Sequence, residues 1–377
     1  MTRTIEFGIF MPVASNGFLF SKHAPRYHPT FDQHRRIALL AEKIGIDYLF
    51  WMGKWKGFGG DTGFWEQSLE PLTLVSGIAA VTTRIRLLAT INPLLFPPPV
   101  AAKMITTIHE VSNGRFGINV VTGNTLDEVE QMGVVPSGYN EYRYDYADEW
   151  MEVLYRLWTE KHVTFDGRFF HLSNCVSDPK PRQSPPPAIV SAGTSDEGLR
   201  FAAKHSELIF IGNRPPLIAK VKQLAADAGR TIKVSTNLFV VARASDAEAE
   251  AEYALIQEGV DLNALDNVRG SFDRDNRAST PARTAYLREP APVGFGMGAP
   301  VVGSPATVAR KIVRLILDHG FDGVQFTFVD YLRDLDMFAR DVVPILSRML
   351  ATEGVAANLN RRLDEAPRHP EEVGQPT

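Results

Sequence analysis

The sequence predicts an α/β fold, a (β/α)8 TIM barrel with insertions, and two observations indicate it. Short apolar runs alternate along the chain with longer amphipathic segments, which is the pattern of a parallel sheet with crossover helices. About eight of the apolar runs are candidate strands, and eight is the number in this barrel. The candidate strands are residues 5–13, 46–52, 85–91, 115–122, 187–193, 207–212, 232–242 and 323–329.

Helical segments are expected in the gaps between these strands. Residues 31–44 repeat apolar side chains at helical spacing from Ile37 to Ile44, and Gly45 is a typical stop signal. Residues 69–81 and 100–111 have the same pattern. Each of these helices is followed by a candidate strand, as the barrel repeat requires.

Two stretches do not fit the minimal repeat. Residues 140–186 combine an aromatic-rich helix with a hairpin expected around Asp166-Gly167, and residues 260–300 have little periodic apolar signal. Long insertions in compact domains tend to be lids or binding loops. We therefore expect one barrel domain over residues 1–357 with these two insertions. Residues 358–377 are polar and rich in proline, and we expect a disordered tail there.

Composition excludes several classes of protein. The formal net charge of −4 gives no electrostatic reason to expect binding to nucleic acid or to an anionic membrane. The single cysteine, Cys175, rules out an intrachain disulfide, and its neighbours favour an inert thiol. Histidines are scattered without metal-ligand spacing, so no metal site is expected. No membrane span or signal peptide is visible, and a cytoplasmic location is the default expectation.

A polar cluster follows the fourth candidate strand. Asn119, Thr122 and Asn124 end a buried apolar run, where polar groups need hydrogen-bonding partners. A ligand at the carboxyl ends of the strands would provide them, as in other barrels of this class. Ordinary strand-exit chemistry is the alternative, because Thr-Gly-Asn is also a common turn.

A second candidate binding feature is Gly193-Thr-Ser-Asp-Glu-Gly198, which leads directly into a helical pattern. Free backbone amides and hydroxyls at the start of a helix suit a phosphate group. The alternative is structural, with Ser195 or Asp196 as the N-cap of the helix. No glycine-rich nucleotide fingerprint or phosphate-binding loop occurs elsewhere in the sequence.

A series of short motifs, in order along the chain, resembles the bacterial luciferase-like flavin monooxygenases. The likeness covers residues 5 to about 212 well and residues 301–346 more loosely, and within the family it is greatest to members that open the uracil ring. The motifs are Asn16-Gly17, His23-Ala-Pro25, Lys54 with Gly57-Phe-Gly-Gly60, Ala79-Ala-Val-Thr82, Gly114-Arg-Phe-Gly117, Val121-Thr-Gly123, Gln131-Met-Gly133, Arg143-Tyr-Asp-Tyr146 and Ala192-Gly193 with Ser195.

The resemblance implies a barrel that uses FMN as FMNH2, together with O2, through a flavin peroxide. A separate NAD(P)H flavin reductase would supply the reduced flavin as a transient partner. The family's oxygen pocket falls on Thr90 and Asn119, which would be the catalytic residues, with Phe50 and Met52 as apolar walls. His23 and Tyr144 would donate hydrogen bonds to a small-molecule substrate. The family's flavin contacts fall on Gly53, Lys54, Asn119, Glu128, Arg143, Tyr144 and Ser195.

The sequence departs from the family at Asn124, where close relatives carry tryptophan. A carboxamide in place of an indole removes a large flat wall beside the flavin ring. The stretch Gly212-Asn-Arg-Pro-Pro216 also differs from the equivalent loop of the relatives and is shorter. We therefore expect a heteroaromatic or cyclic-amide substrate larger than uracil, for example riboflavin, which would be cleaved to lumichrome and ribose.

Several alternatives remain at the level of sequence. A pyrimidine or a sulfone could be the substrate of the same chemistry. A protein of another class, binding flavin or coenzyme F420 without oxygenation, could share the fold. We also expect a homo-oligomer, either a dimer or a tetramer.

Overall fold

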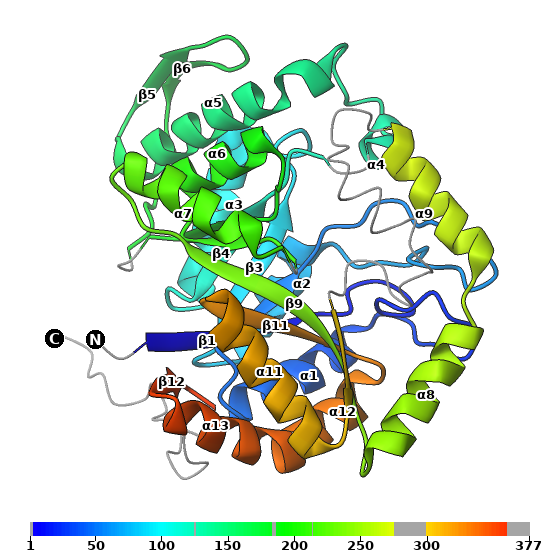
Figure 1. The fold of residues 1–377 in the computed structure, drawn as a ribbon. Helices are drawn as coiled ribbons and strands as arrows, with labels where there is room; N and C mark the ends of the chain where they lie inside the picture. The colour runs from blue at the N-terminus through cyan, green and yellow to red at the C-terminus, as the bar shows by residue number, and fades with distance from the viewer. Residues whose placement is uncertain (1–2, 124–125, 183–185, 213, 275–298, 360–377) are drawn as a thin grey trace, which may run out of the picture.

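A closed parallel barrel of eight strands forms the centre of the molecule (Figure 1). The computed structural model describes residues 3–123, 126–182, 186–212, 214–274 and 299–359. The sheet runs β1-β2-β3-β4-β7-β8-β9-β11, and β11 pairs with β1 to close the barrel. The strands are β1 (Arg3–Phe10), β2 (Tyr48–Trp51), β3 (Arg86–Ile91), β4 (Phe116–Val120), β7 (Ala188–Ser191), β8 (Leu208–Phe210), β9 (Lys233–Ala242) and β11 (Gly323–Phe328).

The (β/α)8 prediction is confirmed, since all eight candidate strands overlap the barrel strands. Two short strands escaped the prediction. β10 (Ala299–Gly303) extends the sheet beside β9, and β12 (Val355–Ala357) pairs with β1. β10 lies at the end of a segment with little periodic apolar signal, and β12 has only three residues, so neither stands out from the surrounding sequence.

Helices surround the barrel on its outer side (Figure 1). The three helices expected from periodicity are present, and proline at the first helical positions advances the start of α3 to Pro98. The helices are α1 (Phe31–Lys43), α2 (Pro71–Val81), α3 (Pro98–Val111), α4 (Asp127–Glu130), α5 (Tyr139–Thr159), α6 (Asp196–His205), α7 (Pro216–Asp227), α8 (Asp246–Glu258), α9 (Leu262–Arg274), α11 (Pro305–His319), α12 (Tyr331–Met337), the π-helical turn η1 (Phe338–Val342) and α13 (Val343–Thr352).

Aromatic side chains pack together along the strands of the barrel. The Phe50 ring centroid lies 4.9 Å from that of Phe10 and 4.8 Å from that of Phe210. Gly8 must lack a side chain, because a Cβ there would lie 2.1 Å from the Tyr48 ring. The barrel is therefore a packed core and not a pore, so a ligand has to bind at its mouth.

The first predicted insertion has the expected form. The aromatic-rich helix is α5, and the hairpin around Asp166-Gly167 consists of β5 (Val163–Asp166) and β6 (His171–Cys175). The Tyr146 ring of α5 packs 4.9 Å from that of Phe170. The hairpin therefore covers the outer side of α5 at the edge of the molecule (Figure 1).

The second predicted insertion contains a helix that we did not expect. Residues 262–274 form α9, in which the apolar side chains of Ala264, Leu265 and Val268 are buried. Asparagine and aspartate are weak helix formers, so their frequency in this segment hid the pattern. Residues 275–298 lie outside the described structure. Residues 360–377, which are most of the tail for which we expected disorder, also lie outside it.

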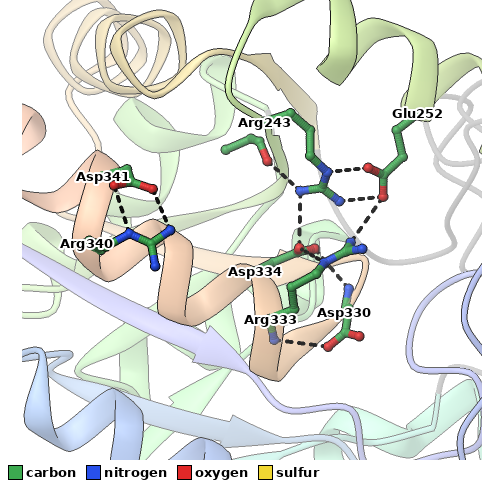
Figure 2. A network of polar contacts seen from close by, with 8 residues as sticks. Arg243, Glu252, Asp330, Arg333, Asp334, Arg340 and Asp341 are labelled. Carbon is green, nitrogen blue, oxygen red and sulfur yellow. Dashed lines mark hydrogen bonds and ion pairs between the residues drawn. The ribbon is translucent and has the colours of Figure 1, made fainter.

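A network of arginines and acidic residues anchors α8, the helix that precedes α9 (Figure 2). Arg243, directly after β9, pairs with Glu252 of α8 and lies 3.1 Å from Asp334 of α12. Arg333 bridges the same two carboxylates, at 3.2 Å from Glu252 and 2.8 Å from Asp334. The network ties the excursion between β9 and β10 to a helix that follows β11.

Candidate functional site

Two polar side chains meet at the carboxyl ends of β3 and β4. Thr90 and Asn119 are register partners on these strands, and Asn119 Nδ2 donates to Thr90 Oγ1 at 3.0 Å. Asn119 is buried, and its Oδ1 has no hydrogen-bond partner among the described residues. The Asn119 oxygen is therefore available to accept a hydrogen bond from a ligand that carries an N–H donor.

Gly53 and Lys54 lie in the loop after β2, and Gly53 borders this pair. A Cβ on Gly53 would lie 3.7 Å from Thr90 Cγ2, so the backbone of the loop passes close to the Thr90 side chain. Lys54 Nζ forms an ion pair with Glu128 of α4, whose other carboxylate oxygen accepts from Trp55 N at 3.0 Å. Two expected cofactor residues from different elements are therefore in direct contact.

The Lys54–Glu128 pair is enclosed by aromatic rings. The two side chains are only 3% and 13% exposed, and Lys54 Nζ lies 3.9 Å from the Phe58 ring centroid. Burial lowers the pKa of the Lys54 ammonium, and the charge of Glu128 opposes that shift. A desolvated ion pair of this kind is costly to form, so a role in ligand binding would account for it better than stability does.

Helix α9 holds the loop that carries Lys54, a function that sequence reasoning missed. Asn267 Nδ2 donates to Phe58 O at 2.8 Å, and the Ser271 hydroxyl donates to Asp127 Oδ1 at 2.9 Å. Asp261, just before the helix, accepts from Thr62 N at 2.6 Å. α9 thus joins the loop after β2 to α4 (Figure 1). The polar residues that obscured the helical pattern in the sequence are thus among those that make these contacts.

A second group of predicted residues meets at the amino terminus of α6. Ser195 is the N-cap, since its hydroxyl accepts from Gly198 N at 3.1 Å. The Tyr144 hydroxyl would lie 2.8 Å from a Cβ placed on either Gly193 or Gly198. The two glycines thus leave room for a tyrosine hydroxyl beside the helix start. The alternative that Ser195 caps the helix is therefore correct. Other backbone amides of the first turn of α6 still point out of the helix start, where the Tyr144 hydroxyl lies.

Arg143 belongs to the same end of the site. It precedes Tyr144 in α5, is 7% exposed, and donates from Nη1 to Gly123 O at 3.1 Å. Its guanidinium carbon lies 5.5 Å from the Tyr144 ring centroid. The structure therefore excludes a solvated helix face for Arg143. A cation, a tyrosine hydroxyl and a helix start lie together, which is a combination suited to a phosphate.

The remaining predicted residues are more dispersed. Phe50 contributes to the aromatic packing of the barrel, and Met52 is partly buried against the main core. His23 is exposed, and its Nδ1 lies 3.0 Å from Leu255 O of α8. The hydrogen bonds of His23 among the described residues run to Ser21 and Leu255, and not to the Thr90–Asn119 pair. Asn124 lies outside the described residues.

The described residues also bear on metals and membranes. Among the described residues, no group of three or more His, Cys, Asp or Glu side chains could hold a metal ion. The described helices include none that is both long and apolar enough to cross a membrane.

Comparison with known proteins gives the family. Residues 5–322 match the family model described as luciferase-like monooxygenase. The chain is 38% identical to pyrimidine monooxygenase RutA of Pantoea ananatis (strain LMG 20103) over 91% of this chain and 96% of that protein. It is 37% identical to pyrimidine monooxygenase RutA of Escherichia coli (strain K12), over 91% of each chain. This chain belongs to the luciferase-like monooxygenase family, and it is an enzyme of the flavin-dependent monooxygenase class.

A solved structure has a similar fold. The crystal structure of riboflavin lyase (RcaE), with modified FMN and the substrate riboflavin, superposes with a TM-score of 0.80. The match covers 94% of this chain and 93% of that one, at 24% sequence identity. At this level of identity the likeness concerns the fold.

Proposed function

We propose that this enzyme is the oxygenase component of a two-component monooxygenase, which uses FMNH2 from a separate flavin reductase together with O2. The observation that carries the proposal is the pairing of Thr90 with Asn119, whose Oδ1 is buried without a partner among the described residues. An N–H group of a flavin ring would satisfy this acceptor. The residues at the start of α6 fit the other end of FMN, a phosphate.

The protein's own groups would bind the cofactor at two ends. Arg143, Tyr144 and the amides at the start of α6 would hold the phosphate. Gly53 would let the ring approach the backbone beside Thr90, and Asn119 would fix its orientation. The Lys54–Glu128 pair, held by α9, would close the mouth on a third side.

Reduced FMN, when bound, would supply the electrons and activate O2, so the chain needs no acid–base dyad. The role of the protein is to orient the reactants and to exclude water. The Thr90 hydroxyl accepts from Asn119 and keeps its own proton, which it can donate to an oxygen atom beside it. Thr90 would thereby stabilise negative charge that develops on oxygen.

The substrate class that we propose is a heteroaromatic or cyclic-amide compound larger than uracil, and riboflavin is the example to test first. Similarity to the pyrimidine monooxygenases supports the cyclic-amide class. The larger size rests on the sequence alone, because Asn124 replaces an indole and lies outside the described residues.

Product analysis tests the proposal directly. The enzyme would be incubated with FMN, a flavin reductase, NADH and either uracil or riboflavin, and the products identified by mass spectrometry with 18O2. We expect incorporation of one 18O atom into a ring-opened product, or lumichrome from riboflavin. Asn124→Trp should reduce turnover of riboflavin more than turnover of uracil. If reductase-coupled turnover produces only hydrogen peroxide with every substrate, the enzyme is not an oxygenase of this class.

FMN binding provides a second, independent test. Arg143→Ala should weaken FMN by about 1.5–3 kcal/mol, the range for hydrogen bonds to charged groups. Arg156→Ala is the matched control, because Arg156 lies further along α5 and pairs with Glu160 at 2.7 Å. A dissociation constant that is unchanged in both variants would remove Arg143 from the site.

A further inference from the structure

We propose that Arg214 is a second phosphate-binding cation for FMN, an inference that rests on the proposed function. Arg214 lies in the loop after β8, a part of the chain outside the family's expected flavin contacts. Its Nη1 donates to Thr194 Oγ1 at 2.6 Å. Thr194 stands in the loop after β7, between Gly193 and Ser195.

The position of Thr194 brings Arg214 to the phosphate end of the site. On one side of Thr194, the space above Gly193 is filled by the Tyr144 hydroxyl. On the other side, Ser195 caps α6. Strands β7 and β8 are paired neighbours, so the loops that follow them leave the barrel side by side. Arg143 of α5 lies beside the Tyr144 ring, and Arg214 reaches Thr194 from the β8 side.

The local backbone restricts where Arg214 can lie. Arg214 N donates to Gly212 O at 2.9 Å, and Gly212 has a φ of 60°, which glycine adopts at little cost. Two prolines follow, and Pro216 begins α7. Proline fixes its own φ and restricts the residue before it, so Pro215 limits the backbone conformations open to Arg214. A restricted backbone lowers the entropy lost when the guanidinium binds an anion.

The negative charges near the start of α6 make a second cation favourable for binding a phosphate there. Asp196, in the first turn of α6, is paired with Lys220 at 2.6 Å, while Glu197 beside it is exposed. A phosphomonoester carries about −1.5 to −2 charges at pH 7. One guanidinium balances only part of that charge, and Arg143 with Arg214 would balance the whole. A guanidinium has five N–H donors, so it can bond a hydroxyl and a phosphate at once.

The test compares FMN with riboflavin, which has the same ring and ribityl chain but no phosphate. Dissociation constants would be measured on the apoenzyme by flavin fluorescence titration, and riboflavin would be measured by competition with FMN so that both report on one site. Arg214→Gln should weaken FMN roughly 10- to 100-fold and leave riboflavin unchanged. Arg214→Lys should recover most of the affinity at low salt, because it restores the charge.

Arg230→Gln is the matched control. Arg230 follows α7, as Arg214 precedes it, and its Nη2 lies 3.4 Å from Ser206 O at the opposite end of α6. This variant should bind FMN like the wild type. The wild type should also lose affinity for FMN more steeply with NaCl than Arg214→Gln does, since one fewer charge contacts the phosphate.

The outcomes separate the two proposals. Unchanged FMN affinity in Arg214→Gln, with FMN bound normally by the wild type, overturns the role of Arg214 and leaves the proposed function standing. Equal weakening of FMN and riboflavin shows a structural effect on the site and also overturns it. A wild-type enzyme that binds no FMN overturns both.

Discussion

Asn119 donates a hydrogen bond to the Thr90 hydroxyl on the neighbouring strand, at 3.0 Å, and keeps a buried carboxamide oxygen without a described partner. Both side chains end adjacent strands of one parallel sheet. Their contact is therefore fixed by strand register, and small movements of the surrounding loops would leave it intact.

Thr90→Val and Asn119→Ala should both abolish oxygenation while FMN binding stays measurable. Valine nearly matches threonine in shape, so loss of the hydroxyl is the main change. Turnover with excess FMNH2 would be followed beside an FMN titration. Normal turnover in both variants would place the reaction with oxygen elsewhere in the protein.

Gly198→Ala should weaken FMN, because a Cβ at this position would lie 2.8 Å from both the Tyr144 hydroxyl and Gly193 C. The tyrosine or the loop has to move away from the helix start. Gly270→Ala in α9 is the control, since nothing lies within 4 Å of the Cβ it would add. That control should raise the free energy of unfolding by up to about 1 kcal/mol, as alanine favours helix, and bind FMN normally. Equal FMN affinity in the two variants would contradict the close approach of Tyr144.

The Lys54–Glu128 pair should show strong coupling in a double-mutant cycle. Lys54→Met or Glu128→Gln alone leaves one charge buried and should cost about 3–5 kcal/mol of the free energy of unfolding, whereas the double variant should cost much less than the sum. Urea denaturation of the apoenzymes gives the free energy of unfolding of the wild type, the two single variants and the double variant. The exposed pair Arg340–Asp336 should give little coupling in the same cycle. Additive losses at Lys54 and Glu128 would show that the two charges do not interact.

His34 should make the enzyme less stable in mild acid. Burial lowers the pKa of this histidine to about 4, and its Nδ1 accepts from Trp51 Nε1 at 3.3 Å. The unfolded chain takes up a proton near pH 6.5, and the folded chain resists it until about pH 4. The free energy of unfolding should thus fall as pH decreases from 6.5 to 4, by roughly 3 kcal/mol from this group.

His34→Gln keeps an acceptor for Trp51 and removes the titration. Urea unfolding of both proteins at several pH values should show that the wild type loses more stability than the variant between pH 6.5 and 4. Parallel pH profiles would rule out His34 as the source.

The parts of the site that sequence could predict are those set by single strands and their immediate exits. Asn119 follows from the end of a strand and Ser195 from the start of a helix, whereas Thr90 came from the family resemblance. Arg143 and Glu128 needed the family resemblance, because both lie on helices where a charged residue is usually solvated. Asn267 and Ser271 gave no usable signal. Their role depends on contacts across the fold, which residue type and spacing do not encode.

The contacts of α9 also bear on how the chain folds. Asn267 and Phe58 are 209 residues apart in sequence, and Ser271 and Asp127 are 144 apart. Such long-range contacts form only after the entropy of closing a large loop has been offset by other interactions. We expect the barrel to assemble first and the mouth around Lys54 to order last. Pulse-labelled hydrogen exchange during refolding should then protect the strand amides before those of Trp55 and Thr62.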